Sequence, residues 1–476
     1  MKRIKKTKII ATLGPSTSSA NCIEKLINEG VDVLRINFSH SSHEQAEALI
    51  KDIRQVNTKL NTNTSILADL QGPKLRIGNI SPDTNLKDGN EISIKTGEEF
   101  IGDEKTIFIN YQNLPKEINI GEKILIDDGK VILKVTDTNK KDEINAEIIQ
   151  GGDLFSNKGF NLPNTNISQP ALTEKDIKDA VFSAKQNVDW IALSFVRHES
   201  DVKFLIKLLA KNTDHRIPVI AKIEKPEGVK NIDNIMKYAS GVMVARGDLG
   251  VEINATEVPL IQKKLVYKAK KARIPVIIAT QMMESMMESL NPNRAEVNDV
   301  ANSVMDGADA VMLSGETSVG KHPIEVIQTI SSIIGKVENS NLISLKHKHP
   351  TDYDSERFIT KSICYYAAKI ANDTNAKAIS TLTNSGYTAY QISSWRPKTH
   401  VLVFTSNKRI LTQLNLLWGV KAFYYDSTES TDKTVEEINK IAFDNNYLHK
   451  DDKVINLTSM PIHLKGMVNT VRVSKI

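Results

Sequence analysis

The stretch VIAKIE (residues 219–224) is a short apolar run in which an ammonium and a carboxylate group stand two residues apart. An apolar run of this length without polar alternation is typical of a strand buried on both faces of a parallel sheet. On a strand, Lys222 and Glu224 point the same way. The stretch therefore predicts a core strand that presents two charges at its carboxyl end.

Seven further apolar runs resemble this one, and helix-like segments lie between most of them. One such segment is residues 18–30, where Ser18 or Ser19 is a candidate N-cap and Gly30 a candidate C-cap. Alternating strands and helices favour a parallel sheet, and eight units predict a closed (β/α)₈ (TIM) barrel of the α/β class. The seven runs are residues 7–14, 31–39, 65–70, 190–196, 241–247, 276–281 and 310–316.

Two parts of the chain break this rhythm. From residue 73 to 170 helical periodicity is lost, and residues 123–135 read as a hairpin around Asp127, Asp128 and Gly129. We therefore expect a small all-β domain, a β-barrel lid, inserted after the third barrel strand. The barrel would comprise residues 1–72 and 171–345, the lid residues 73–170, and a C-terminal α/β domain for regulation or oligomerisation residues 346–476.

Composition excludes several classes of protein. The 476 residues are 40% hydrophobic and 25% charged, with a net charge of +5 and no long basic run, so nucleic-acid binding is not expected. No apolar run approaches the ~18 residues of a membrane span. Cys22 and Cys364 have no metal-ligand or disulfide-framework spacing. We expect a cytoplasmic protein without nucleic-acid or membrane partners.

Polar residues gather where the predicted barrel strands end, which is the functional face of such barrels. They are Arg35, Asn37 and Ser39 after the second strand, Asp69 after the third, Lys222 and Glu224 on the fifth, Asp248 after the sixth and Thr280 after the seventh. Each alone has an ordinary structural explanation, since a Lys–Glu pair is often a buried ion pair and Gly-Asp-Leu-Gly often a turn. Convergence of all of them on one rim favours a functional site, because uncompensated buried charge is costly.

The residue types fit phosphoryl transfer. Glu224 and Asp248 offer the hard oxygen ligands that Mg²⁺ prefers. Lys222 and Arg35 supply positive charge where a transferring phosphoryl group spreads negative charge over its oxygens. Residues 246–250 place backbone N–H groups near a helix start, where a carboxylate or phosphate binds.

The chain resembles the pyruvate kinase family along essentially its whole length. The resemblance rests on long motifs in the family's order, among them ATLGPS (11–16), LRINFSH (34–40), DLQGPKLRIG (69–78), NKGFNLP (157–163), AKIEKPEG (221–228), ARGDLGVEI (245–253), ATQMMESM (279–286) and residues 299–323. It implies transfer of the phosphoryl group of phosphoenolpyruvate to ADP, giving pyruvate and ATP, with Mg²⁺ or Mn²⁺ as cofactor.

The resemblance also assigns roles to individual positions. Lys222, Arg35 and Thr280 would be catalytic, and Gly247 and Asp248 would bind the substrate together with these three. Glu224 and Asp248 would hold the metal. The nucleotide site would be lined by Asn37, Phe38, Ser39, His40, Arg76 and Lys158, with Asp128 nearby. The inserted domain would act as a lid that excludes water.

One motif departs from the common pattern. Many members bind K⁺ at positions matching Asn37, Ser39, Asp69 and Leu70, and read Asp-Thr-Lys-Gly-Pro-Glu in the third motif. This chain has Leu70, and Lys74 replaces the glutamate. An ammonium can supply the charge that K⁺ brings. The pattern resembles the K⁺-independent branch, and we expect K⁺ not to be required; the alternative is a surface lysine at the lid hinge.

In the C-terminal domain, Thr383, Ser385, Gly386 and Thr388 lie between a predicted strand and a helix start, as in a phosphate-binding loop. The resemblance implies possible allosteric control by a phosphometabolite, although Asn384 and Tyr387 disfavour fructose 1,6-bisphosphate. It also implies a homotetramer. Two other functions stay open: a metal-dependent carbon–carbon lyase of the same barrel type, and a catalytically inactive metabolite-binding relative.

Overall fold

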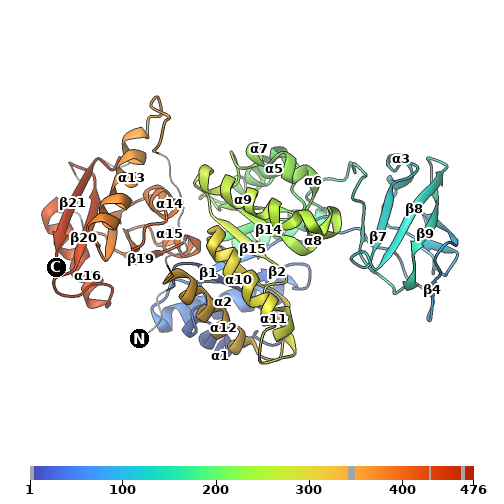
Figure 1. The fold of residues 1–476 in the computed structure, drawn as a ribbon, viewed down its shortest axis with the longest axis horizontal. Coiled ribbons are helices and arrows are strands. Elements are labelled where there is room, and N and C mark those ends of the chain that lie inside the picture. Colours follow the sequence, from blue (N-terminus) through green and yellow to red (C-terminus); the bar gives the residue numbers. More distant parts are fainter. Residues whose placement is uncertain (1–4, 341–348, 428–429, 462–466) are drawn as a thin grey trace.

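A computed structural model describes residues 5–340, 349–427, 430–461 and 467–476. Three parts lie in a row, with the barrel in the middle, the inserted β domain at one end and the C-terminal domain at the other (Figure 1). The expected boundary at residues 345/346 falls outside the described residues. Within the described ranges, no helix is long and apolar enough to cross a membrane.

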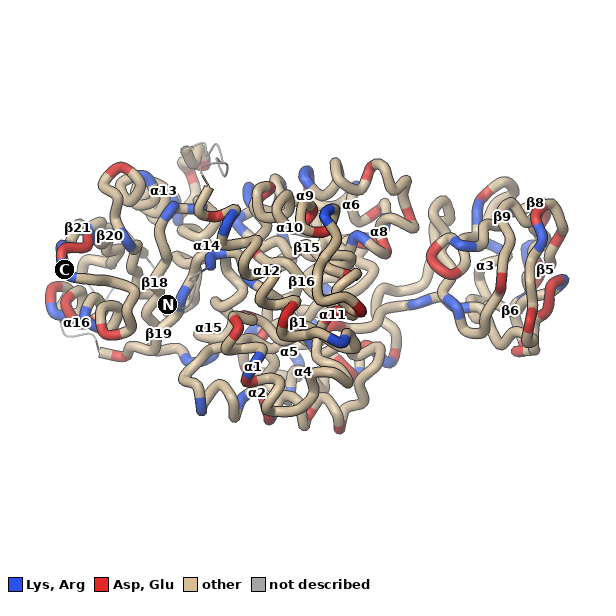
Figure 2. Tube along the Cα trace, turned by 60° about the horizontal axis from the view of Figure 1, so that its bottom comes forward, with Lys and Arg blue, Asp and Glu red and all other residues tan. Residues whose placement is uncertain are grey.

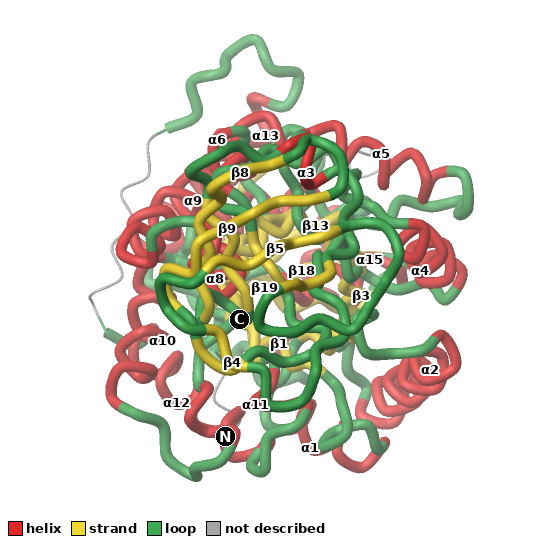
Figure 3. Tube along the Cα trace, turned by 90° about the vertical axis from the view of Figure 1, so that its right-hand side faces the viewer, coloured by secondary structure: helices red, strands yellow, loops and turns green. Residues whose placement is uncertain are grey.

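Eight parallel strands close the central barrel, as the sequence predicted. In chain order they are β1 (Lys8–Thr12), β2 (Val33–Asn37), β3 (Ser65–Asp69), β12 (Trp190–Leu193), β13 (Val219–Ile223), β14 (Gly241–Ala245), β15 (Val276–Ala279) and β16 (Ala310–Leu313). Strand β1 pairs with both β2 and β16, which closes the ring. Seen along the long axis of the molecule, helices surround these strands (Figure 3).

Helices surround the barrel, and the longer ones each bury an apolar face against it. The surrounding helices are α1 (Ala20–Asn28), α2 (His43–Leu60), α4 (Glu174–Lys185), α5 (Glu199–Ala210), α6 (Pro226–Lys230), α7 (Ile232–Ile235), α8 (Arg246–Glu252), α9 (Val258–Ala272), α10 (Arg294–Asp306), α11 (Gly315–Ser318) and α12 (Pro323–Glu338). Ser19 caps α1 by accepting from the Cys22 N–H, as expected, while the C-cap is Glu29 and Gly30 follows with φ 107°.

The barrel interior explains where the functional face lies. Val33, Leu67 and Ile220 belong to one fully buried cluster inside the barrel. Because strand side chains alternate, the residues two positions later point to the same interior. These later residues are Arg35, Asp69 and Lys222. The apolar interior therefore gives way to charge at the carboxyl ends of three strands.

The insertion between β3 and β12 is built mainly of antiparallel strands. Its elements are β4 (Asn85–Leu86), β5 (Glu91–Lys95), β6 (Thr106–Phe108), α3 (Leu114–Glu117), β7 (Lys123–Ile126), β8 (Val131–Thr138), β9 (Glu143–Gln150), β10 (Gly152–Asp153) and β11 (Phe160–Asn161). The predicted hairpin is confirmed as β7 and β8. The six-stranded sheet ends at the two-residue β11 and the three-residue β6, and the segment before it bridges both edges, through Arg76 to Gly159 and through Ile77 to Ile109.

The C-terminal domain is a five-stranded sheet in the order β19-β18-β17-β20-β21, in which only the β20–β21 pair is antiparallel. Its elements are α13 (Phe358–Asp373), β17 (Ala378–Leu382), α14 (Tyr387–Ser394), β18 (His400–Thr405), α15 (Lys408–Gln413), β19 (Val420–Tyr424), α16 (Thr431–Asp444), β20 (Lys453–Thr458) and β21 (Thr470–Lys475). Basic and acidic positions are interspersed over all three parts of the molecule (Figure 2).

Candidate active site

Four of the predicted residues form one buried chain of charges at the barrel mouth. Arg35 Nε donates to Asp69 Oδ2 at 2.7 Å, and Lys222 Nζ lies 3.2 Å from Asp69 Oδ1 and 3.1 Å from Glu224 Oε1. Arg35 also donates to the hydroxyl of Thr12. Two cations thus alternate with two carboxylates over strands β2, β3 and β13.

The electrostatics of this chain keep Lys222 charged. Burial alone would lower the pKa of Lys222, but Asp69 and Glu224 outweigh it, and the pKa is raised above its ordinary value. Burial would likewise raise the pKa of Asp69, yet Lys222 and Arg35 hold it below its usual range. The ammonium therefore remains available as a fixed positive charge at neutral pH.

Glu224 has a second partner besides Lys222. Its Oε2 accepts from the backbone N–H of Phe195 at 2.6 Å, and Phe195 adopts a left-handed backbone with φ 54°. Burial raises the pKa of Glu224; Lys222 lowers it, and the nearby Asp248 carboxylate raises it further. Two carboxylates that repel each other at the mouth of a barrel are suited to share a cation.

These two carboxylates fit a divalent metal as part of its shell. Among the described residues, no group of three or more His, Cys, Asp or Glu side chains could hold an ion by itself. Mg²⁺ is usually bound by one or two carboxylates and completes its shell with water and substrate oxygens. Glu224 and Asp248 match that requirement, so substrate would have to supply further ligands.

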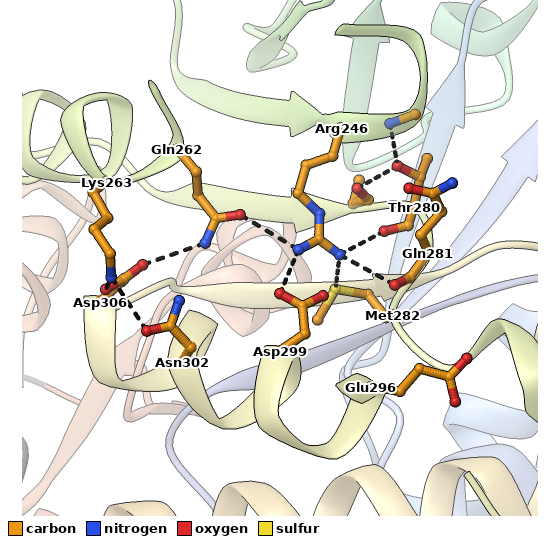
Figure 4. A network of polar contacts seen from close by, with 12 residues as sticks. Arg246, Gln262, Lys263, Thr280, Gln281, Met282, Glu296, Asp299, Asn302 and Asp306 are labelled. Atoms are coloured by element: carbon orange, nitrogen blue, oxygen red, sulfur yellow. Dashed lines mark hydrogen bonds and ion pairs between the residues drawn. The ribbon is translucent and has the colours of Figure 1, made fainter. Parts of the chain in front are cut away.

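A strained turn beside helix α8 presents Thr280. Thr280 and Gln281 both have left-handed backbones, with φ 68° and 53°, and the Thr280 hydroxyl accepts the Gly247 N–H at 2.8 Å. Arg246 holds this turn in place: its guanidinium donates to the carbonyl oxygens of Thr280 and Gln281 and pairs with Asp299 at 2.7 Å (Figure 4). The predicted substrate-binding amide of Gly247 therefore donates to the Thr280 side chain here, and a substrate carboxylate would take the place of that hydroxyl.

A cavity of about 220 Å³ lies between the barrel mouth and the inserted domain. Its charged lining residues are Lys74, Arg76, Asp127, Asp128, Lys158, Arg197, Lys225 and Asp248. In the inserted domain, Lys158 pairs with Asp127 at 2.9 Å, and Arg76 donates to the Asn157 carbonyl. Five cations against three carboxylates suit an anionic ligand that brings a metal ion.

The other predicted nucleotide residues lie outside this cavity lining. The Phe38 ring is buried edge-on against His43 and Phe182, so its side chain belongs to the barrel core. Asn37 Oδ1 accepts the backbone N–H of Ser39, and His40 is exposed. Residues 37–40 thus form a turn at the rim with no side-chain contact to the cavity among the described interactions.

Lys74 lines the cavity, next to Gly159 of the inserted domain. Within the described residues it has no ion pair, and the Asp69 carboxylate is already held by Arg35 and Lys222.

In the C-terminal loop, Thr383 Oγ1 accepts the Gly386 N–H at 2.9 Å, Ser385 is exposed and Thr388 is buried. Gly386, with φ 81°, begins α14.

Comparison with known proteins decides the family. The model "Pyruvate kinase, barrel domain" matches residues 4–327, and "Pyruvate kinase, alpha/beta domain" matches residues 361–474. The chain belongs to the pyruvate kinase family. It is 41% identical to the pyruvate kinase of Corynebacterium efficiens over 98% of this chain and 97% of that one, and 40% identical to that of Corynebacterium glutamicum over the same shares.

A solved structure agrees. The crystal structure of a pyruvate kinase from Cryptosporidium parvum superposes with a TM-score of 0.91 at 32% identity, covering 99% of this chain and 96% of the other. The chain is thus a phosphotransferase of glycolysis that converts phosphoenolpyruvate and ADP into pyruvate and ATP. These matches decide against the lyase and the inactive relative as alternatives.

Sequence reasoning missed three residues of this pyruvate kinase site. Ser194 accepts from Lys222 Nζ at 2.6 Å and donates to the Leu70 carbonyl. Strand alternation from Trp190 was a signal that could have found it. Arg246 was read only as part of a backbone motif. Glu252, which binds Lys225 and Asn161, carried no local signal because its partners lie far away in sequence.

Proposed function

We propose that phosphoryl transfer takes place at the Arg35–Asp69–Lys222–Glu224 chain. The observation that carries this proposal is the pair of buried cations held between carboxylates at the barrel mouth. A phosphoryl group in transfer spreads charge over its oxygens, and preorganised cations lower that barrier without reorganising. Asp69 fixes both cations, so neither has to be drawn in by the substrate.

Each residue has a distinct role in this proposal. Lys222 and Arg35 contact the phosphoryl oxygens of phosphoenolpyruvate. The backbone amides of Gly247 and Asp248, with Thr280, hold its carboxylate. Thr280 also stands beside the carbon that takes up a proton once the enolate forms. The turn held by Arg246 keeps these groups in register with Lys222.

Glu224 and Asp248 hold the Mg²⁺ or Mn²⁺ ion in this proposal. When bound there, the metal stabilises the negative charge left on the enolate oxygen. The Phe195 N–H orients one oxygen of Glu224, and Lys222 balances the other. These two groups thereby orient Glu224 without being metal ligands themselves.

ADP would enter the cavity between the barrel and the inserted domain. Arg76 and Lys158 would meet its phosphates from the lid side, near Asp128. Asn37, Phe38, Ser39 and His40 lie at the barrel rim outside this cavity lining and would contact the part of ADP that extends beyond it, with Phe38 contributing backbone only because its ring is buried. Closure of the inserted domain would exclude water from the transferring group. We divide the chain as residues 1–72 with 171–345, 73–170, and 346–476.

The test measures pyruvate formation from phosphoenolpyruvate and ADP with Mg²⁺, comparing wild type, Lys222→Met and an exposed control, Lys211→Met. We expect Lys222→Met to lose about 10²–10³-fold in kcat, as for removal of one preorganised charge-stabilising donor, and Lys211→Met to match wild type. Ser194→Ala, which keeps the ammonium but removes its hydroxyl partner, should lose less. Wild-type turnover by Lys222→Met would refute the assigned role.

We further propose that activity needs no added K⁺ and that Lys74 supplies the charge. The support is the sequence departure and the position of Lys74 at the cavity wall. Wild type assayed in K⁺-free buffer should keep most of its rate, and Lys74→Glu should become K⁺-dependent. A K⁺-free rate below about a tenth of the full rate would refute K⁺ independence. A K⁺-independent Lys74→Glu variant would refute the role of Lys74.

We also propose an effector site in the C-terminal domain and an oligomeric state. The loop with Thr383, Ser385, Gly386 and Thr388 would bind a phosphorylated effector. A homotetramer is supported by exposed apolar side chains on α9, where Leu260 and Tyr267 are each 70% exposed. Phosphometabolite titration and sedimentation test these two points. We place the enzyme in the cytoplasm because its reaction is a step of glycolysis, with no nucleic acid or membrane as partner.

A further inference from the structure

We propose that Glu252 is a positioning residue that couples the inserted domain to the metal-binding end of the barrel. It does so through a junction of three residues, Glu252, Lys225 and Asn161, which we call the latch. The inference rests on the proposed roles of Glu224 and Asp248. It adds a residue that contacts neither substrate nor metal but sets where their ligands lie.

The latch is held by one carboxylate oxygen. Glu252 Oε1 accepts from Lys225 Nζ at 2.5 Å and from Asn161 Nδ2 at 2.7 Å. The Glu252 side chain is 0% exposed and that of Lys225 is 9% exposed. Two donors on one oxygen, in a site shielded from water, fix the relative positions of all three residues.

Each member of the latch belongs to a different functional segment. Glu252 is the last residue of α8, the helix that begins with Arg246, Gly247 and Asp248. Lys225 directly follows Glu224 at the end of β13. The third member belongs to β11 of the inserted domain, whose sheet it joins by pairing with Leu125 on β7. The latch therefore links both proposed metal ligands to the lid.

Burial argues that the latch serves geometry more than stability. Glu252 Oε2 is buried without a hydrogen-bond partner among the described residues. A buried carboxylate with one oxygen unsatisfied is costly, and replacing a buried ion pair by apolar side chains often stabilises a protein. Lys225 and Asn161 both line the cavity proposed for ADP. The charged arrangement is thus placed where the lid, nucleotide and metal sites meet.

The consequence is a coupling between the two ligands. When the inserted domain moves, Asn161 shifts and displaces its partner Glu252. Glu252 in turn displaces Lys225, which lies next to Glu224 in the chain. ADP binding at the lid side and metal binding at Glu224 and Asp248 then favour the same latch position. By linkage, each ligand raises the affinity for the other by the same factor.

The test uses Glu252→Gln, Asn161→Ala and a matched control, Glu257→Gln, at an exposed carboxylate one turn beyond α8. Binding of Mn²⁺ to the full chain is measured by electron paramagnetic resonance without and with ADP, alongside the KM for ADP and thermal unfolding. Glu252→Gln should weaken Mn²⁺ binding about 10-fold or more, the usual range for residues that orient metal ligands. The control should match wild type.

Asn161→Ala should leave Mn²⁺ affinity without ADP within about twofold of wild type, but lose the enhancement by ADP and raise the KM for ADP about 5-fold. In the double variant, Asn161→Ala should have little further effect, since the junction is already broken. A general loss of stability would not produce this pattern. If Glu252→Gln does not fold, Lys225→Met takes its place with the same expected loss of Mn²⁺ affinity.

Wild-type Mn²⁺ affinity and wild-type ADP enhancement in Glu252→Gln would overturn the latch. So would additive effects of the two single variants. Glu224→Gln separates this outcome from failure of the proposed site. If Glu224→Gln abolishes Mn²⁺ binding while Glu252→Gln does not weaken it, only the latch is wrong. If Glu224→Gln binds Mn²⁺ like wild type, the metal site itself is wrong and the latch proposal falls with it.

Discussion

Arg246 offers the sharpest prediction, because one guanidinium supports the strained turn that carries Thr280. Its Nη2 donates to the Thr280 carbonyl at 2.7 Å and to the Gln281 carbonyl at 3.3 Å, and its Nη1 donates to Asp299 at 2.7 Å (Figure 4). Lysine has a single nitrogen and cannot reach this set together. The change Arg246→Lys should therefore release the turn while keeping the charge.

The size of the effect follows from these bonds. Hydrogen bonds to a charged group contribute about 1.5–3 kcal/mol each, so the two carbonyl contacts contribute about 3 kcal/mol at the low end. The Asp299 side chain is 32% exposed, and a pair that solvated adds at most about 1 kcal/mol. Arg246→Met should thus lose about 4 kcal/mol, and Arg246→Lys about 1.5 kcal/mol because the ion pair and one carbonyl contact can persist.

Activity should fall further than stability. A displacement of a substrate-positioning group by about 1 Å can cost about 10²-fold in rate. We expect Arg246→Lys to lose about 10–100-fold in kcat/KM for phosphoenolpyruvate, with a much smaller change in the KM for ADP. Steady-state kinetics and thermal unfolding measure both effects. Asp299→Asn is the control, since it keeps both carbonyl contacts. An Arg246→Lys enzyme with wild-type kcat/KM would refute the reasoning.

Two further predictions concern the stability of the folded chain, one at a glycine and one at a histidine. At Gly72, with φ +73°, an added Cβ would lie 2.6 Å from the Phe195 ring, so Gly72→Ala should lose at least about 2 kcal/mol in chemical unfolding. Gly121→Ala is its control, with φ +89° and open space, and an equal loss in both would contradict the clash. Burial lowers the pKa of His400 from 6.5 to about 4, so the unfolded chain binds a proton that the folded protein does not. The protonation of His400 therefore leaves the free energy of unfolding unchanged above pH 6.5 and lowers it by about 3 kcal/mol towards pH 4. In His400→Gln the free energy of unfolding should fall less steeply as the pH is lowered. An unchanged slope would contradict this.

Much of the fold and the charged chain could be predicted because both follow from local pattern. Apolar runs without alternation identified the barrel strands, and the alternation from Val33 to Arg35 or from Ile220 to Lys222 placed charges at the mouth. The family motifs then named the ligands. The bridges of Arg76 and Ile77 to the two edges of the inserted sheet could not be foreseen, because they join residues far apart in the sequence.

The supporting residues were harder to predict for a physical reason. Ser194 binds Lys222 from a neighbouring strand, and Glu252 meets Asn161 across 91 positions of sequence. The first contact exists only once β12 and β13 are paired, and the second only once the barrel and the inserted domain are folded together. Sequence motifs therefore gave the charges of the site, while the groups that hold those charges in place required the structure.

The most direct test of the site is the position of the metal. Crystals grown with Mn²⁺ and phosphoenolpyruvate, measured for anomalous scattering from manganese, should show one strong peak in contact with the carboxylates of both Glu224 and Asp248. The phosphoryl group should lie against Lys222 and Arg35. A manganese peak bound elsewhere at the barrel mouth, with Glu224 still engaged only by Lys222 and Phe195, would contradict the assignment.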